Sequence, residues 1–202
     1  MKKIAVIDYG AGNLRSVEKA LRHLGCECVI SADPGVLAAA DGAILPGVGA
    51  FGDAMGQLRA RGLEEPIRAF VETGKPFLGI CLGLQILFES SEESPGVAGL
   101  GLLRGKILRL PGDRGLKVPH MGWNSLQVRG GSLLDGLGEE PYVYFVHSYY
   151  LQAEEEIVAA TAEYGVRFHA AVQKENLMAC QFHPEKSGDV GLRILANFAA
   201  ML

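Results

Sequence analysis

The chain has 202 residues, of which 49% are hydrophobic and 21% are charged, and its formal net charge is −4. This composition is typical of a globular protein that is long enough to bury a sizeable core, and it argues against a disordered chain. The net negative charge and the scattered Lys and Arg residues argue against a nucleic-acid-binding protein, which needs a basic surface.

Short strands and helices alternate in the first half of the chain. Strands are predicted at residues 4–8, 27–30, 42–45 and 75–80, and helices at 13–24, 36–40 and 63–74. The first helix is indicated by the spacing of Leu14, Val17 and Leu21 on one face, and Gly25 ends it. Such alternation predicts a parallel sheet with helices on both faces.

The second half of the sequence consists mostly of strand-like pieces. These pieces, at residues 105–110, 124–130, 142–151 and 156–164, are separated by turns that contain Gly, Pro or Asp. A last buried strand is predicted in "LMACQFHPE", and a helix at 189–202 ends the chain. We find no repeat or linker. We therefore expect an α/β fold in one domain over residues 1–202, with a mixed, mostly parallel central sheet and an added antiparallel portion in the second half.

The hydrophobic runs and the cysteines indicate the compartment. No apolar run reaches the roughly 20 residues that a membrane-spanning helix needs, and the first run, residues 4–7, is too short for a signal peptide. We therefore expect a cytoplasmic protein that has no membrane partner. Cys26, Cys28 and Cys180 form neither a C-x-x-C nor a zinc-like pattern and are expected to be small core residues.

Cys81 stands in a G-x-C-x-G pattern, where a predicted strand meets a predicted helix. This pattern, formed with Gly79 and Gly83, is the cysteine counterpart of the G-x-S-x-G nucleophile elbow. A tight turn exposes the nucleophile there, and flanking glycines avoid steric clashes. The N-terminus of the following helix favours the thiolate, and the backbone N–H of Leu82 is available to an oxyanion. We therefore predict that Cys81 is a nucleophile; the alternative is a buried cysteine in a glycine-rich turn.

A nucleophilic thiol needs a base, and the base needs an orienting group. Of the five histidines, only His183 follows a predicted buried strand and has a carboxylate two residues later. Pro184 stiffens this loop, so the His183 imidazole and the Glu185 carboxylate are expected to lie together. Zinc deaminases also contain H-x-E, but their P-C-x-x-C is missing here, so no metal is expected. His147 is expected to be a structural histidine and His23 to be solvated.

The motifs "GICLGLQ" and, about a hundred residues later, "QFHPEKSG" resemble those of the class I (triad) glutamine amidotransferases. The resemblance covers nearly the whole chain and implies the flavodoxin-like fold of that family, without a cofactor. It also implies that Cys81 attacks the side-chain amide of L-glutamine, that His183 is the general base and acid, and that Glu185 orients His183. Ammonia then leaves, and water hydrolyses the glutamyl thioester to glutamate.

Four further segments, "IDYGAGN", "PGVGAFGDAM", "PHMGWN" and "FVHSYY", resemble the glutaminase subunits of imidazole glycerol phosphate synthase. That family implies a heterodimer with a barrel cyclase subunit, which receives the ammonia through a channel for histidine biosynthesis. Glutaminases of pyridoxal phosphate, anthranilate or GMP synthesis remain alternatives, because the elbow and the His-Pro-Glu run do not separate them. A binding module with a degenerate site is disfavoured, because Cys81, His183 and Glu185 are all present.

The same resemblance assigns roles outside the triad. It places glutamine against Gly49, Gln85, Glu93, Ser148 and Tyr149, the oxyanion near Val48, Gly49 and Leu82, and the partner against Asn13, Met121, Trp123, Tyr144 and Lys186. Gln85 has support from its spacing as well, because residues i and i+4 of a helix share a face. Without the resemblance, Met121 and Trp123 would be interpreted as core residues, and Lys186 as a solvated loop charge.

The stretch "LPGVGAFGDAM" contains Gly47, Gly49 and Gly52 in the G-x-G-x-x-G pattern of a dinucleotide-binding turn. That fingerprint normally follows the first strand and opens a well-formed helix. Here it follows the third predicted strand, and Gly56 and Gly62 interrupt the helical pattern beyond it. A dinucleotide-binding oxidoreductase is therefore only a remote alternative. We predict instead that Gly47 and Gly49 let the backbone beside the elbow turn an N–H toward the substrate.

Overall fold

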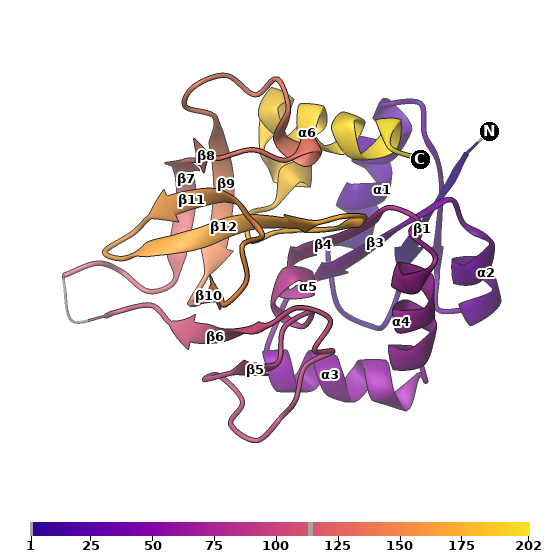
Figure 1. Ribbon diagram of the computed structural model, residues 1–202, viewed down its shortest axis with the longest axis horizontal. Helices are drawn as coiled ribbons and strands as arrows, with labels where there is room; N and C mark the ends of the chain where they lie inside the picture. Colours follow the sequence, from indigo (N-terminus) through magenta and orange to yellow (C-terminus); the bar gives the residue numbers. More distant parts are fainter. Residues whose placement is uncertain (1, 113–114) are drawn as a thin grey trace.

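A computed structural model describes residues 2–112 and 115–202 (Figure 1). Within these ranges, the main sheet contains 11 strands in the order β2-β1-β3-β4-β13-β12-β10-β6-β5, and β11 and β8 join it beside β12. A second sheet pairs β7 with β9. Among the described residues, no helix combines the length and the apolar character that crossing a membrane requires.

The parallel part of the main sheet holds the strands that alternate with helices. Its strands are β2 (Glu27–Ser31), β1 (Lys3–Ile7), β3 (Gly42–Gly47), β4 (Phe77–Cys81) and β13 (Leu177–Cys180). Both β3 and β4 are buried along their whole length, as expected of central parallel strands that are covered on both faces.

Two layers of helices cover this part of the sheet. The helices are α1 (Leu14–His23), α2 (Pro34–Ala39), α3 (Phe51–Ala60), α4 (Glu64–Glu72) and α6 (Gly188–Ala200). Alternate residues of β1 pack against different layers: Ile4 and Val6 share a core with α1 and α6, whereas Ala5 and Ile7 share a core with α2, α3 and α4 (Figure 1). The period of two residues in a strand explains this division.

The remaining strands form the mainly antiparallel part of the structure. They are β5 (Ser90–Ser91), β6 (Gly105–Arg109), β8 (Gln127–Val128), β10 (Tyr149–Ala153), β11 (Val158–Glu163) and β12 (Arg167–Lys174) in the main sheet, and β7 (His120–Ser125) and β9 (Tyr142–His147) in the second. The pairs β10–β12, β12–β13 and β7–β9 are antiparallel. The predicted mixed sheet with an added antiparallel portion is therefore confirmed.

Four sequence-based expectations were wrong. Gly56 does not interrupt a helix, because α3 runs through it and ends at Ala60. The helix after the elbow, α5 (Leu82–Gln85), is a single turn. The eight-residue strand β12 was not predicted. Cys26 precedes β2 and is only half-buried, whereas Cys28 and Cys180 are buried as expected.

Candidate active site

The candidate site lies where three parallel strands end. The register aligns Gly47 with Cys81 and Cys180 with Ile80, so the ends of β3, β4 and β13 meet at one edge of the sheet. A cavity of about 320 Å³ opens there and is lined by Val48, Gly49, Cys81, Leu82, Gln85, Glu93, Pro119, Val146, His147, Ser148, Tyr149 and His183. The fold thus brings together the residues assigned to glutamine and to the oxyanion, whose roles remain predictions.

The backbone at Cys81 has the shape of a nucleophile elbow. Cys81 ends β4 with φ 56° and ψ −109°, a combination that L-residues other than glycine rarely adopt. A Cβ on Gly83 would overlap the carbonyl oxygen of Leu45 and lie 2.9 Å from its carbon, and a Cβ on Gly79 would lie 2.8 Å from the carbonyl oxygen of Gly83. The flanking glycines are therefore required, as predicted. The single turn of α5 offers only a weak helix dipole to the thiol.

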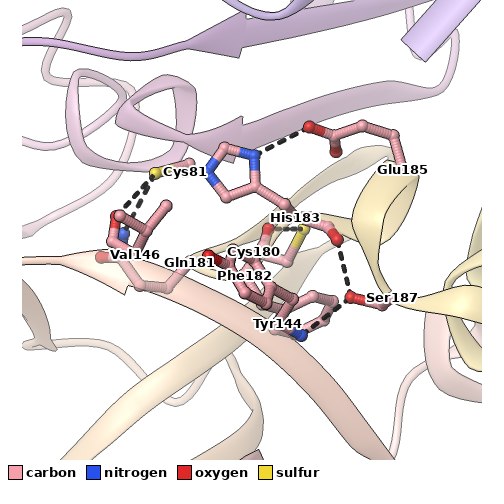
Figure 2. A network of polar contacts seen from close by, with 9 residues as sticks. All are labelled: Cys81, Tyr144, Val146, Cys180, Gln181, Phe182, His183, Glu185 and Ser187. Carbon is pink, nitrogen blue, oxygen red and sulfur yellow. Dashed lines mark hydrogen bonds and ion pairs between the residues drawn. The ribbon is translucent and has the colours of Figure 1, made fainter. Parts of the chain in front are cut away.

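The Cys81 sulfur is nearly buried, and only 6% of the residue is exposed. The thiol lies 3.9 Å from the carbonyl oxygen of Val146, to which it donates, and the side-chain amide of Gln181 donates to the sulfur over 3.7 Å (Figure 2). The imidazole of His183 lies between this sulfur and the carboxylate of Glu185 (Figure 2).

His183 and Glu185 form a buried pair. Nδ1 of His183 lies 2.8 Å from Oε1 of Glu185, and the two side chains are 2% and 1% exposed. Nε2 of His183 is buried and has no hydrogen-bond partner among the described residues. Burial lowers the pKa of His183, but the Cys81 sulfur and the Glu185 carboxylate raise it more strongly, to about 9. The arrangement fits a nucleophile, a base and an orienting carboxylate.

The His-Pro-Glu loop is fixed by contacts that the sequence alone does not reveal. The loop forms the short 3-10 helix η2 (Pro184–Lys186). The Ser187 hydroxyl donates to the carbonyl of His183 over 2.6 Å and accepts from the Tyr144 amide over 2.9 Å. A Cβ on Gly191 of α6 would overlap the Pro184 carbonyl oxygen. Ser187 stands in the run "QFHPEKSG" without an assigned role, and no local pattern marks Gly191, because both act through contacts that only the tertiary fold creates.

The glycines of "PGVGAFG" serve three different purposes. A Cβ on Gly47 would overlap the buried hydroxyl of Tyr9, which has no hydrogen-bond partner in the described part of the chain, and one on Gly52 would lie 2.8 Å from Oγ of Ser94. Gly49 has open space but adopts φ +100°, which favours glycine. Glu93 accepts from the amide of Phe51 over 2.8 Å at the start of α3. The stretch therefore connects the end of β3 to α3 beside the nucleophile.

Comparison with known proteins identifies the family. Residues 5–202 match the family described as "Glutamine amidotransferase class-I". The chain belongs to this family. It is 52% identical over 200 residues to imidazole glycerol phosphate synthase subunit HisH of Methanothermobacter thermautotrophicus, with 98% of each chain covered. It is 54% identical over 205 residues to the HisH subunit of Syntrophotalea carbinolica, with 98% of this chain and 100% of that protein covered.

Solved structures of amidotransferase-like proteins support the fold. The structure of PurLQS from Thermotoga maritima matches with a TM-score of 0.77 at 23% sequence identity, over 98% of each chain. A structure described as a glutamine amidotransferase matches with a TM-score of 0.75 at 24% identity, over 96% of this chain and 98% of that chain. At these identities the likeness concerns the fold alone, and it confirms the predicted amidotransferase architecture.

Two further histidines of this amidotransferase lie at or next to the cavity, and their ring nitrogens have hydrogen-bond partners. Nδ1 of His147 lies 2.9 Å from the carbonyl oxygen of Tyr149, and its Nε2 lies 2.9 Å from Nδ1 of His120. Because the carbonyl can only accept, His147 donates from Nδ1 and accepts at Nε2. Burial lowers the pKa of His147 to about 3 and that of His120 to about 4. His147 is thus a structural histidine that also lines the cavity, and His23 is exposed at the end of α1.

The residues assigned to a partner lie mostly on one exposed face of the amidotransferase. Met121 and Trp123 of β7 are 62% and 56% exposed, so interpreting them as core residues would be wrong. The rings of Trp123 and Tyr144 lie edge to face with centroids 6.1 Å apart, and Nζ of Lys186 lies 5.8 Å from the centre of the Tyr144 ring. Asn13, at the start of α1, lines a separate surface cavity.

Proposed function

We propose that this chain is the glutaminase subunit of an imidazole glycerol phosphate synthase. It hydrolyses L-glutamine and delivers the ammonia to a barrel cyclase subunit for histidine biosynthesis. The observation that carries this proposal is the buried arrangement of Cys81, His183 and Glu185 beside the cavity. The names of relatives that are 52% and 54% identical over nearly the whole chain support the pathway.

The first half-reaction forms the thioester. The Cys81 thiolate attacks the amide carbon of glutamine, and the carbonyl oxygen becomes an oxyanion. We assign the stabilisation of that oxyanion to the N–H of Leu82 and to an N–H near Val48 and Gly49, because these residues line the cavity together with Cys81. His183 gives a proton to the amine, the C–N bond breaks, and ammonia leaves. The raised pKa of His183 supports this step, because the imidazole still carries a proton at neutral pH.

The second half-reaction regenerates the thiol site. His183, now neutral, accepts a proton from a water molecule, whose oxygen attacks the thioester carbonyl carbon. The C–S bond breaks, and glutamate leaves. Glu185 keeps the Nδ1–H of His183 directed at itself, so that Nε2 faces the reacting atoms in both half-reactions.

The cavity suits a small, polar substrate. The Glu93 carboxylate lines it and complements the α-ammonium group of glutamine. Gly49, Gln85, Ser148 and Tyr149 supply further polar groups around the same space. We propose that these five residues hold the substrate with its amide near Cys81. No cofactor takes part in these steps.

We further propose that the exposed face with Met121 and Trp123 binds the cyclase. Strand β7 begins next to the cavity, because Pro119 lines the cavity and His120 is the first residue of the strand. Ammonia released at Cys81 therefore has a short path to a partner on this face. Lys186 and Tyr144 extend the face, and Asn13 is proposed as an additional contact.

The remaining proposals concern organisation and compartment. We propose that residues 1–202 form one amidotransferase domain and that it works in the cytoplasm. The four cysteines form no disulfide, and the nucleophile has to stay a thiol. Both points support a reducing compartment such as the cytoplasm.

An ammonia-release assay tests the proposed function. The isolated chain should hydrolyse glutamine weakly, and the chain with the barrel cyclase and the cyclase ligand should hydrolyse it strongly. Partner subunits from pyridoxal phosphate, anthranilate and GMP synthesis serve as comparisons and should not activate it. Equal rates with and without the cyclase would argue against the synthase assignment. Cys81→Ala should abolish ammonia release in a folded protein, and retained release would overturn the triad assignment.

A further inference from the structure

We propose that Gln181 is a further catalytic residue, whose amide nitrogen donates to the Cys81 sulfur while its amide oxygen holds Gln85 at the cavity. The inference rests on the proposed function in one respect, namely that Cys81 is the nucleophile. Gln181 belongs to the run "QFHPE", but the sequence alone assigns it no role.

The sheet register places Gln181 beside the nucleophile. In the parallel pair β4–β13, Ile80 is aligned with Cys180. Cys81 and Gln181 directly follow these two residues, so they lie side by side where the two neighbouring strands end. Gln181 is fully buried, and its backbone N–H donates to the carbonyl of Ala170 over 2.8 Å. Its side chain therefore starts from a fixed point and has no access to solvent.

The hydrogen bonds determine which way the Gln181 amide faces. The carbonyl oxygen of Tyr149 can only accept, so the Gln85 atom at 3.0 Å from it has to be the amide nitrogen. The same nitrogen of Gln85 lies 3.0 Å from Gln181, and that atom of Gln181 has to be the oxygen. The nitrogen of Gln181 then points at the Cys81 sulfur, 3.7 Å away. The positions of oxygen and nitrogen in the Gln181 amide thus follow from the backbone carbonyl of Tyr149, and the flipped orientation of the amide is excluded.

The donor from Gln181 becomes important when Cys81 loses its proton. As a thiol, Cys81 can donate to the carbonyl oxygen of Val146. As a thiolate it cannot donate, and that oxygen then repels the negative sulfur. The N–H of Gln181 stabilises the same negative charge, because a hydrogen bond to the charged form favours that form. The Gln181 amide is neutral and does not act as a base, so it does not compete with Glu185 for the proton of His183.

The oxygen of Gln181 has a separate effect on the substrate cavity. It accepts from Gln85, whose nitrogen also donates to Tyr149. Both hydrogen bonds direct the Gln85 nitrogen away from a ligand and leave its amide oxygen as the group that Gln85 presents to the cavity. Gln181 thereby links the nucleophile to a residue of the proposed glutamine site through a single side chain.

Two variants separate these effects. Gln181→Glu keeps the shape and keeps an acceptor for Gln85, but it replaces the N–H donor beside Cys81 with a negative oxygen. Gln181→Met keeps the approximate length and removes both the donor and the acceptor. Gln173→Met in β12 is the matched control, since Gln173 bonds Ser132 and Leu133 through its amide and lies outside the cavity lining.

The first measurement is the pH dependence of alkylation of Cys81 by iodoacetamide, quantified by mass spectrometry of the peptide that carries Cys81. We expect the midpoint to rise by more than about one pH unit in Gln181→Glu and by about half a unit to one unit in Gln181→Met. Gln173→Met should leave it unchanged. Coincident profiles for the parent, Gln181→Glu and Gln181→Met would overturn the inference. Because Gln181→Glu preserves the shape of the side chain, its alkylation midpoint still tests the inference if Gln181→Met fails to fold.

The second measurement is glutaminase kinetics of each variant in complex with the cyclase. Gln181→Glu should lower kcat by about 10-fold or more with KM within about threefold of the parent. Gln181→Met should lower kcat and also raise KM by about 10-fold, because Gln85 loses its anchor. An unchanged KM in Gln181→Met would remove the proposed link to Gln85. If Cys81→Ala retains ammonia release, the proposed function fails; if the parent triad behaves as proposed and the profiles coincide, only the inference about Gln181 fails.

Discussion

Replacing Gly191 by alanine should damage the site from the far side of the His-Pro-Glu loop. Gly191 lies in α6, where alanine normally stabilises a helix by about 1 kcal/mol relative to glycine. Here the added Cβ would overlap the carbonyl oxygen of Pro184 and lie 2.7 Å from its carbon and 2.9 Å from Cβ of Ser187. Ordinary contacts begin at 3.4 Å. To take the carbon contact from 2.7 Å to 3.4 Å, α6 and the loop have to separate by at least about 0.7 Å.

The expected changes in stability and in kcat follow from the catalytic residues that lie in the displaced loop. Pro184 stands between His183 and Glu185, whose side chains meet at 2.8 Å. Overpacking costs about 1–3 kcal/mol and the gain in helix propensity offsets about 1 kcal/mol of it, so we expect the free energy of unfolding to fall by up to about 2 kcal/mol. A misplacement of about 1 Å lowers rates by about 100-fold, so kcat should fall by about 10- to 100-fold.

Two assays check this reasoning with a matched control. Urea unfolding followed by circular dichroism gives the free energy of unfolding, and ammonia release in the presence of the cyclase gives kcat. Gly56→Ala in α3 is the control, because the added Cβ meets nothing within 4 Å. It should gain up to about 1 kcal/mol and keep full activity. If Gly191→Ala proves as stable and as active as Gly56→Ala, the steric argument is refuted.

Three further predictions concern charge, pH and the exposed face. Glu185→Gln should move the titration of His183, followed by NMR, from about 9 to lower pH and lower kcat by about 10- to 100-fold; an unchanged titration would contradict the assigned role of the carboxylate. The folded-state pKa values of His120 and His147 lie below the usual 6.5, so in acid the unfolded chain binds more protons than the folded chain. The contribution of these two neutral histidines to stability is therefore complete above pH 6.5 and declines as the pH falls. Between pH 6.5 and 5 we expect a loss of about 1.5 kcal/mol for each histidine; urea unfolding at both pH values should show a smaller loss in His120→Gln, and equal losses would exclude this linkage. Trp123→Ala should weaken binding to the cyclase by about 10-fold or more in calorimetry while changing the free energy of unfolding by less than about 0.5 kcal/mol, because the residue is 56% exposed; unaltered affinity would place the partner elsewhere.

The elements that determine the site were the most predictable part of the fold. The apolar runs that became β1, β3 and β4 are continuous and bounded by turns, and the pattern around Cys81 leaves little choice of backbone. The strand β12 was missed because its buried residues do not alternate regularly with exposed ones and are divided between the two cores, with Ala170 and Ala171 in one and Val172 in the other. Gly56 was misjudged because tertiary packing of Met55 and Leu58 outweighs the low helix propensity of one glycine.

Within the site, the residues that local patterns marked were predicted, and those that act through tertiary contacts were not. Cys81, His183 and Glu185 stand in short, specific motifs. Gln181 gains its position from the register of β4 and β13, and Ser187 gains its role from a contact with β9. These are long-range pairings, which residue spacing along one strand or helix does not encode.

The strained backbone of Cys81 has a consequence for attempts to make the protein more heat-resistant. A non-glycine residue held at positive φ costs about 1–3 kcal/mol, and Cys81 has φ 56°. Alanine at this position would keep that strain, whereas glycine would release it, so the usual preference for alanine over glycine is reversed. Directed evolution that rewards thermal tolerance without a demand for ammonia production would therefore drive position 81 toward glycine. The cysteine is the residue for which stability and activity make opposite demands, and a screen has to select for both to retain it.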